Sequence, residues 1–278
     1  MLPSLFVSHG SPTFALEPGR VGPLLHALGH QLERPRAILV VSPHWQTRQV
    51  EVGLTARPDT IHDFGGFPED LYQLQYPAPG APGVGTDALA LLQAAGIPAR
   101  ANLQRGLDHG AWVVLMHLYP DHDIPVFQVS LTPDMDPRAT YALGQALAPL
   151  GKQSVLLLGT GGITHNLYDF RMGMGGTLAY VPAFAEWLAR TMAAGDLESL
   201  LDYRQLAPEA VRAHPTEEHL LPLFFALGAA GPEWTQVLRL EGGIEYGMLS
   251  MDAYRFGPGP DLGELLAGAG QTPATDLA

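Results

Sequence analysis

The stretch AILVVSPHW, residues 37–45, joins an uninterrupted apolar run to a histidine. A short apolar run with a proline directly behind it is typical of a strand that is buried on both faces of a sheet. His44 is therefore expected to emerge where this strand ends. The chain opens in the same way, because a predicted strand at residues 4–8 leads directly into His9. The sequence thus predicts two buried strands that each carry a histidine at the exit.

Helical and strand-like segments alternate along the rest of the chain. Further strands are expected at residues 50–55, 98–102, 125–130, 154–159, 235–240 and 248–256. Helices are expected at about 20–32, 84–95, 138–150 and 182–194, with a short buried helix before Pro120. Another helix is expected within 215–231, with Pro215 and Thr216 at its cap and Glu217 and Glu218 in its first turn. This alternation predicts an α/β fold whose mostly parallel or mixed sheet has helices on both faces.

No linker or repeat divides the chain, so a single domain is expected over residues 1–256. Residues 257–278 are rich in Gly, Pro and Ala and are predicted to form a flexible tail. The segment 61–83 is aromatic and full of Gly and Pro, which predicts a long loop with at most a helical turn or two near residues 69–74. A loop of this length in a compact domain is usually functional or disordered, and its aromatic residues argue against disorder.

Composition limits the classes of function. The 278 residues carry a net charge of −13, which argues against nucleic acid and anionic lipid as partners. No apolar run is long enough to span a membrane and no signal peptide is evident, so a cytoplasmic location is expected. Cysteine is absent, which excludes disulfides, thiolate ligands and cysteine nucleophiles. Any transition metal must therefore be held by the eleven histidines or by carboxylates.

Three histidines follow predicted strands directly. Beside His9 and His44, His165 comes after the strand at 154–159 within the glycine turn TGGITHNL. Ligands of open α/β sheets bind beyond the carboxyl ends of the strands, so parallel neighbours would bring these three side chains to one crevice. Each histidine alone is also compatible with a polar cap at a strand end. Their shared position favours a ligand site.

The other histidines give weaker signals. His219 is expected near the start of a buried helix, His109 at a loop-to-helix boundary, and His62 in the aromatic loop beside Asp63. His214 is close to His219 but is assigned a structural role. A solvated or structural role is also assigned to His26, His30, His117 and His122.

Competing chemistries leave no clear signature. Ser11 has no G-x-S-x-G elbow around it, and H-E-x-x-H does not occur. The segment GTGGIT, residues 159–164, lacks the spacing and the acidic partner of a nucleotide-binding turn. Three or four imidazoles without a thiolate suit a divalent iron or zinc site.

Seven motifs in order resemble one known family over nearly the whole chain, from Leu5 to about Phe256. They are SHGSP (8–12), SPHW (42–45), IHDFGGFP (61–68), YPAPG (76–80), DHGAW (108–112), THNL (164–167) and PTEEHLLPL (215–223). The chain resembles the 4,5-DOPA extradiol dioxygenase family, which belongs to the class III (LigB-type) extradiol ring-cleavage dioxygenases. The resemblance implies insertion of both atoms of O2 into a DOPA-like catechol, with opening of the ring.

The resemblance also implies the site residues. His9, His44 and His219 are expected to ligate the metal, and His165 to act as the catalytic acid/base, or as a fourth ligand when zinc is bound. His109 resembles the family's histidine near substrate and dioxygen. Some other class III enzymes use two histidines and a glutamate, whereas here His219 occupies the matching position. A neutral all-histidine set also attracts zinc, so Fe(II) is expected for activity and Zn(II) is a plausible bound metal.

Several expectations stay open at this level. His165 is expected to titrate near its ordinary pKa, which suits a group that takes up and returns a proton. The aromatic loop is expected to form either a lid over the site or a structural plug, through Phe64, Phe67, Tyr72 and Tyr76. A zinc hydrolase and a non-catalytic, Memo-like metal- or ligand-binding protein are the alternative functions. Nothing identifies the catechol or the oligomeric state, or selects a substrate-binding cation among Arg48, Arg105 and Arg171.

Overall fold

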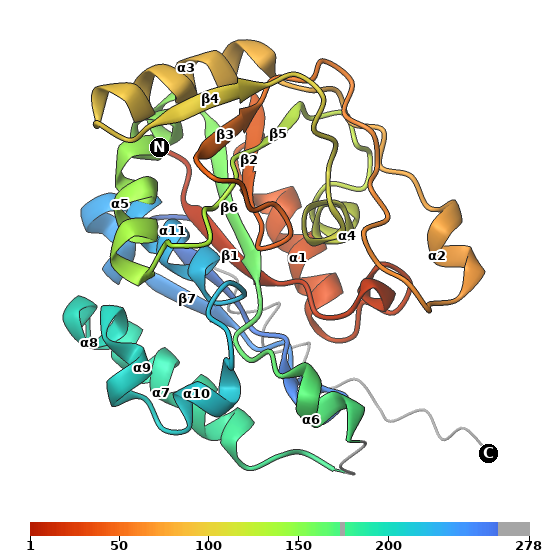
Figure 1. The fold of residues 1–278 in the computed structure, drawn as a ribbon, viewed down its shortest axis with the longest axis vertical. Coiled ribbons are helices and arrows are strands. Elements are labelled where there is room, and N and C mark those ends of the chain that lie inside the picture. Colours follow the sequence, from red (N-terminus) through yellow and green to blue (C-terminus); the bar gives the residue numbers. More distant parts are fainter. Residues whose placement is uncertain (173–175, 261–278) are drawn as a thin grey trace.

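The computed structural model describes residues 1–172 and 176–260, and a six-stranded sheet lies at its centre (Figure 1). Its strands are β1 (Ser4–Ser8), β2 (Ala37–Val41), β5 (Val126–Gln128), β6 (Val155–Gly161), β7 (Val237–Leu240) and β10 (Ala253–Phe256). Their order is β5-β2-β6-β1-β10-β7. The first four strands are parallel to one another, β10 pairs antiparallel with β1, and β7 pairs antiparallel with β10. The predicted α/β fold with a mostly parallel or mixed sheet is confirmed.

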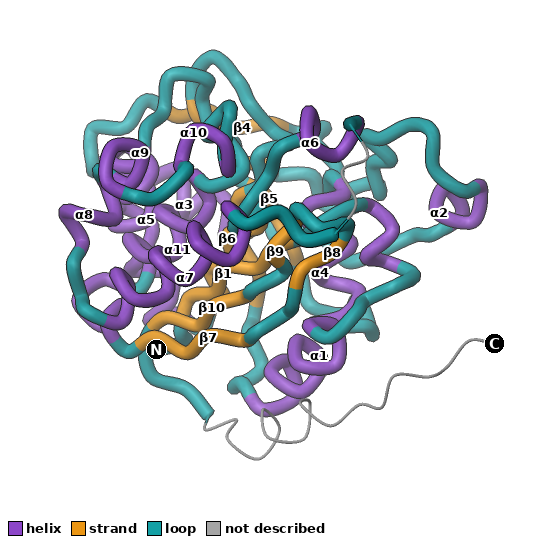
Figure 2. The backbone as a smooth tube through the Cα atoms, turned by 90° about the horizontal axis from the view of Figure 1, so that it is seen from below, coloured by secondary structure: helices purple, strands orange, loops and turns teal. Residues whose placement is uncertain are grey.

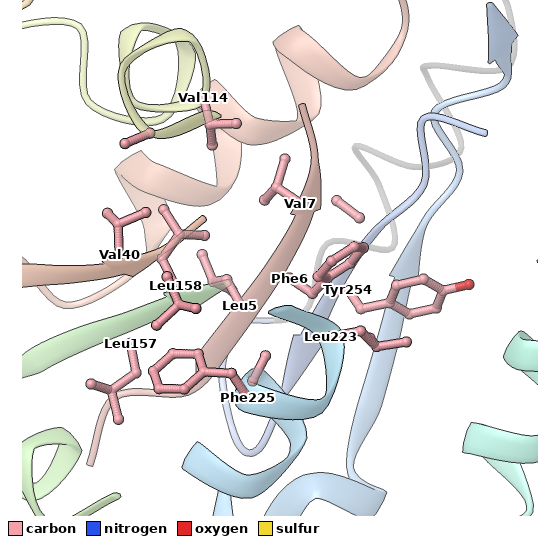
Figure 3. Packing of buried hydrophobic residues seen from close by; sticks show 14 of the residues in the cluster. Leu5, Phe6, Val7, Val40, Val114, Leu157, Leu158, Leu223, Phe225 and Tyr254 are labelled. Atoms are coloured by element: carbon pink, nitrogen blue, oxygen red, sulfur yellow. The ribbon is translucent and has the colours of Figure 1, made fainter. Parts of the chain in front are cut away.

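Helices lie on both faces of this sheet, and Figure 2 shows the strands enclosed by them. The longer helices are α1 (Val21–Gln31), α3 (Pro82–Ala94), α4 (His109–Leu118), α5 (Pro137–Leu147), α7 (Tyr180–Ala193) and α11 (Leu221–Ala229). In Figure 3, Val114 of α4 lies on one side of the strands, and Leu223 and Phe225 of α11 lie on the other. Every residue of β1, β2 and β6 is buried. This two-sided burial is the reason that these strands are continuous apolar runs.

The remaining elements are short. The helices among them are α2 (Glu69–Gln73), α6 (Leu167–Arg171), α8 (Leu197–Leu201), α9 (Tyr203–Leu206) and α10 (Ala210–Ala213), with 3₁₀ turns at Pro12–Ala15, Ala148–Gln153 and Gly231–Thr235. Two small sheets pair β3 (Val50–Gly53) with β4 (Ala99–Asn102) in parallel and β8 (Ile244–Glu245) with β9 (Leu249–Ser250) in antiparallel orientation. Helix α2 confirms the single helical segment predicted inside the aromatic loop.

Two predicted strands were placed correctly in sequence but do not join the central sheet. β3 and β4 pair with each other because β3 carries the buried carboxylate of Glu51. This group accepts hydrogen bonds from Asn102 Nδ2 at 2.6 Å and from Arg100 Nε at 2.8 Å, both on β4. A buried charge needs such partners, which an apolar neighbour in the central sheet does not supply.

Two further boundaries were wrong. The strand predicted at 248–256 is broken into β9 and β10, because the Asp252 carboxylate between them turns to accept the Gly242 N–H at 3.1 Å. The helix predicted to contain Glu217 and Glu218 begins only at Leu221, so His219 lies in the turn before it. Pro222 lies in its first turn, where a helix accommodates proline.

The end of the described chain is tied to the sheet. The Gly257 N–H donates to Gln236 O at 3.0 Å, and the Pro260 carbonyl accepts from Arg255 at 3.0 Å. The rest of the predicted tail, from residue 261, lies outside the described residues, so its flexibility and the domain boundary stay predictions. Within the described ranges, every helix is too short or too polar to cross a bilayer.

Candidate metal centre

Three parallel strands deliver their histidines to the same edge of the sheet. β1 and β6 run in parallel register with Ser8 opposite Gly161, and the His9 N–H donates to Gly161 O at 2.9 Å. His44 and His165 follow β2 and β6 within a few residues. Here a pocket of about 200 Å³ has five histidines in its lining, namely His9, His44, His109, His165 and His219. The structure therefore brings together all the histidines that the sequence predicted for the site.

The five rings are close neighbours. The Nε2 atoms of His9 and His44 are 3.1 Å apart, and the ring centroids of His44 and His109 are 4.0 Å apart. His165 and His219 stack with centroids 3.5 Å apart. Two groups have ligand atoms within 4.8 Å of one another: one is His9, His44 and His109, and the other is His165, Glu218 and His219. The ligand set His9, His44 and His219 stays a prediction, because it takes members from both groups.

His109 is oriented by a carboxylate that sequence reasoning did not select. Asp63 Oδ1 accepts from the His109 backbone N–H at 2.9 Å and from His109 Nδ1 at 3.0 Å. The pKa of Asp63 is lowered to about 2 by its hydrogen bonds with His109, despite the burial that opposes this shift. The ionised carboxylate can only accept, so His109 carries its proton on Nδ1 and leaves Nε2 free for the pocket. In the sequence, only the position of Asp63 next to His62 in the IHDFGGFP motif pointed to this carboxylate.

The first turn of α4 is held by a helix cap that does not involve the His109 side chain. Asp108 caps the helix by accepting the Ala111 N–H at 3.2 Å, and it forms an ion pair with Arg105 at 3.0 Å.

Gly110, the second residue of α4, lets this helix approach the site. A Cβ atom there would lie 2.5 Å from Ser42 Oγ and 3.0 Å from His44 Cδ2, closer than side chains tolerate. A side chain at this position would therefore push α4 away from His44.

The glycines at the end of β6, Gly161 and Gly162, allow a similarly close approach of the chain around His219. The Gly162 N–H donates to His219 O at 2.8 Å, and a Cβ atom at Gly161 would lie 2.1 Å from that same oxygen. The segment GTGG is thus a close-packing surface for the chain that carries His219. On the His219 ring, Nδ1 lies 3.3 Å from Glu218 Oε1. A carboxylate beside the outer ring nitrogen is the usual support of a metal-ligating histidine.

Burial keeps these imidazoles neutral. The pKa values of His9 and His219 lie well below the ordinary value of 6.5, and burial lowers the pKa of His44 to about 4. Burial also lowers the pKa of His165, so the expectation that it titrates near its ordinary value was wrong. A neutral imidazole is the form that binds metal ions and accepts protons. The site therefore offers a cluster of neutral nitrogen donors at neutral pH.

The donor set fits a divalent transition metal. Metal–nitrogen bonds of roughly 2.0–2.1 Å place two ligand nitrogens of one ion about 3 Å apart, which matches the spacing of the His9 and His44 Nε2 atoms. Neutral imidazoles without thiolates suit Fe(II) and Zn(II) alike.

The pocket walls are mostly apolar. Phe64 and Phe67 of the aromatic loop form one side, and Leu167 and Phe170 of α6 lie in the lining with Tyr246. The other two aromatic side chains predicted for the loop, Tyr72 and Tyr76, do not line the pocket. Tyr72 packs against Phe64 at a centroid distance of 5.2 Å, and Tyr76 is buried with its hydroxyl donating to Tyr119 O at 2.9 Å. Half of the predicted aromatic set thus reaches the pocket.

The remaining histidines have other partners. His62 Nε2 donates to Leu74 O at 2.9 Å, and the buried His214 Nε2 donates to Ile163 O at 2.8 Å. His117 Nε2 donates to Phe14 O at 2.8 Å. None of these lines the histidine pocket, in agreement with the structural roles assigned to His117 and His214. A larger hollow of about 550 Å³ elsewhere, lined by Arg20 and Arg239 among others, contains no histidine.

The fold and the site together define an α/β protein with a histidine-rich candidate metal centre at the carboxyl edge of its sheet. Residues 23–247 match the family model described as "Catalytic LigB subunit of aromatic ring-opening dioxygenase", and the chain belongs to this family. The predicted enzyme class, an extradiol ring-cleavage dioxygenase, is confirmed by this match and by the relatives.

Relatives of known name match along most of the chain. The protein named 4,5-DOPA dioxygenase extradiol of Beta vulgaris is 38% identical over 257 residues, which cover 91% of this chain and 96% of the relative. The protein of the same name from Escherichia coli K12 is 37% identical, with coverage of 92% and 95%. A crystal structure of an uncharacterized protein from Escherichia coli K12 matches with a TM-score of 0.75 and 30% identity, over 92% of this chain and 100% of that one.

Proposed function

We propose that this protein is a non-haem, metal-dependent dioxygenase that opens the ring of a catechol on the extradiol side. The observation that carries this proposal is the convergence of five histidines, three buried and two half-buried, on one small, apolar pocket at the carboxyl edge of the sheet. The family match supports ring opening by dioxygen. Catechol as the substrate class and Fe(II) as the active metal are inferences from the donor set and the relatives.

In the proposed site, His9, His44 and His219 hold the metal. Fe(II) held by these residues would supply a redox-active centre that brings the catechol and dioxygen together. Zn(II) suits the same donors but does not undergo redox change, so it is expected to occupy the site without supporting ring opening. Metal binding is expected to be weakened in acid, since the ring nitrogens must be unprotonated to bind.

The other two histidines act on the reactants. His165 is neutral at pH 7 because burial lowers its pKa, so it can take a proton from a catechol hydroxyl at its free ring nitrogen and return it to the product. His109 is fixed by Asp63 with Nε2 towards the pocket, where it hydrogen-bonds the bound reactants. Phe64 and Phe67 exclude water from the reacting centre.

The decisive experiment measures oxygen uptake. The protein is loaded anaerobically with Fe(II) and mixed with a panel of catechols, and the yellow ring-opened semialdehyde is followed beside the oxygen consumed. We expect consumption of one O2 for each ring opened. The His165→Ala variant should keep its metal and lose most of its turnover, whereas unchanged turnover would remove the acid/base role. Absence of uptake with every catechol would contradict the proposed function, and turnover of esters under nitrogen would favour the zinc hydrolase instead.

A further inference from the structure

Helix α1 carries two histidines that lie outside the histidine pocket. His26 and His30 are four residues apart in the segment HALGH, residues 26–30, and both side chains are exposed. The residues of α1 that face the core are Val21, Gly22, Leu24, Leu25, Leu28 and Gly29. Helix α1 lies at the periphery of the molecule (Figure 2), and its two histidines occupy the side turned away from the core. Since residues four apart are neighbours on a helix surface, the two imidazoles stand side by side.

The two ring nitrogens have the spacing of a chelate. The Nε2 atoms of His26 and His30 are 3.1 Å apart, and the ring centroids are 4.4 Å apart. Two nitrogens that bind one metal ion at roughly 2.0–2.1 Å lie about 3 Å from each other. The Nε2 atoms of His9 and His44 in the candidate metal centre show the same 3.1 Å separation. Exposed side chains rotate freely, so both rings can turn their lone pairs to one ion without any change in the helix.

The short contact requires that at least one of the two nitrogens carries no proton. Two N–H groups do not face each other at 3.1 Å, so one Nε2 donates and the other accepts through its lone pair. The hydrogen of the donating ring can move to its Nδ1 atom, because a neutral imidazole carries its hydrogen on either nitrogen. Water reaches both exposed rings and can accept this Nδ1–H group. Two neutral nitrogen donors are thus available on the surface of α1.

The surroundings of His30 attract a cation. His30 lines a hollow of about 150 Å³ together with Asp121 and Asp123. Asp123 forms an ion pair with Arg34 at 2.5 Å, so Asp121 leaves the charged residues of this hollow with one net negative charge. His30 also lies in the last turn of α1, where the carbonyl end of the helix dipole favours positive charge. Both effects stabilise a positive ion beside the histidine pair.

We propose that His26 and His30 form a second metal site, which binds a divalent transition metal ion such as Zn(II) through both Nε2 atoms, with water in the remaining positions. Imidazole donors suit Zn(II), Ni(II) and Cu(II), and zinc is bound by histidines four apart on one helix face in other proteins. The assignment does not depend on the proposed ring cleavage, because the histidine pocket is lined from other segments of the described chain.

Calorimetry tests the site on protein without an affinity tag and with its histidine pocket already filled. One equivalent of Zn(II) is added first, because the pocket offers more donors than the pair, and the titration then continues with further Zn(II). We expect a second and weaker binding event of one ion per chain. His30→Gln should weaken this event at least about tenfold, since the gain from two linked donors is lost. An unchanged first event shows that the variant is folded.

Two matched variants separate the paired geometry from the mere presence of histidine. Gln31 is exposed on the same helix, so His30→Gln combined with Gln31→His keeps the number of histidines but sets them five residues apart. Residues five apart point to different sides of a helix, and this double variant should therefore lose the second event as the single variant does. His122→Gln removes another exposed histidine and should leave both binding events as in the parent protein.

Retention on an immobilised Ni(II) column gives a second readout that involves no turnover. The column contacts only exposed imidazoles, so we expect the parent protein to elute at a higher imidazole concentration than the single and the double His30 variants. Binding of only one Zn(II) per chain by the parent protein would overturn the second site. A second event that survives in both His30 variants, or that is lost equally in His122→Gln, would overturn its assignment to this pair.

Discussion

Asp63 holds His109 by two hydrogen bonds from one carboxylate oxygen, one to the backbone N–H at 2.9 Å and one to the ring Nδ1 at 3.0 Å. Its second oxygen lies 3.9 Å from His44 Nδ1. One acidic side chain in the aromatic loop thus sets the orientation of a histidine on α4 and faces another beyond β2. The loop and the two histidine-bearing segments behave as one unit around the pocket.

Replacement of Asp63 tests this arrangement. Asp63→Asn keeps the size of the side chain but removes the charge that fixes the His109 proton on Nδ1, so we expect kcat to fall by roughly 10- to 100-fold. Metal content, measured by elemental analysis, should change much less than kcat, because Asp63 hydrogen-bonds to His109 and lies 3.9 Å from the proposed ligand His44. Asp59→Asn, at an exposed position just before the aromatic loop, is the control and should behave as the parent protein. A fall in metal content that accounts for the lost turnover would contradict a role through His109.

The ligand set is tested by comparing two alanine variants. We expect His219→Ala to lose most of its bound metal, since it removes a proposed ligand, and His109→Ala to keep its metal while losing turnover. Elemental analysis after dialysis against a dilute chelator measures the first effect, and oxygen uptake measures the second. The ligand atoms of His9, His44 and His109 also lie within 4.8 Å of one another, so these three residues form an alternative ligand set that the same experiment tests. Loss of metal from His109→Ala but not from His219→Ala would assign His109 as the third ligand.

Gly110 offers a test of the packing beneath the site. Gly110→Ala places a methyl group 2.5 Å from Ser42 Oγ, and the resulting overpacking is expected to cost about 1–3 kcal/mol of folding stability and to weaken metal binding. Gly83→Ala is a matched control, because Gly83 is also the second residue of a helix and has no atom within 4 Å of its Cβ position. The control should be neutral or slightly more stable. Thermal unfolding of both variants measures the difference, and equal melting temperatures would show that α4 relaxes without cost.

The histidines at the strand exits could be predicted from the sequence, because their position depends only on residues that are near them along the chain. His9 and His44 sit directly behind apolar runs, so the exits of the strands could be placed before the strand order was known. Asp63 could not be assigned in this way, since its partner lies far along the chain and nothing local marks the contact. The role of Trp45 could not be predicted from the sequence either, because its partner Arg105 also lies far along the chain. Trp45 is buried beneath Arg105 and does not line the pocket. The delayed start of α11 depends on the close contact of His219 with Gly161, which is a tertiary constraint.

The buried His214 predicts how stability changes with pH. Its pKa is lowered from 6.5 to about 4, mainly because burial disfavours the charged ring. Between these values the unfolded chain binds a proton that the folded protein does not, so stability is full above about pH 6.5 and is lost as the pH falls towards 4. The share of this one residue is about 3 kcal/mol in total, of which about 2 kcal/mol is lost between pH 7 and pH 5.

The comparison of His214→Gln with the parent protein separates the contribution of His214 to the pH dependence of stability from the contributions of the other buried histidines. Urea unfolding of the metal-free proteins at pH 7 and pH 5 gives the free energy of unfolding at each pH. The variant is expected to be less stable at pH 7, because it disturbs the bond to Ile163 O, but its loss between the two pH values should be smaller by about 2 kcal/mol. His26→Gln, on the exposed face of α1, should retain the full pH dependence of the parent. An identical pH dependence in His214→Gln would show that His214 is protonated in the folded protein as readily as in the unfolded chain.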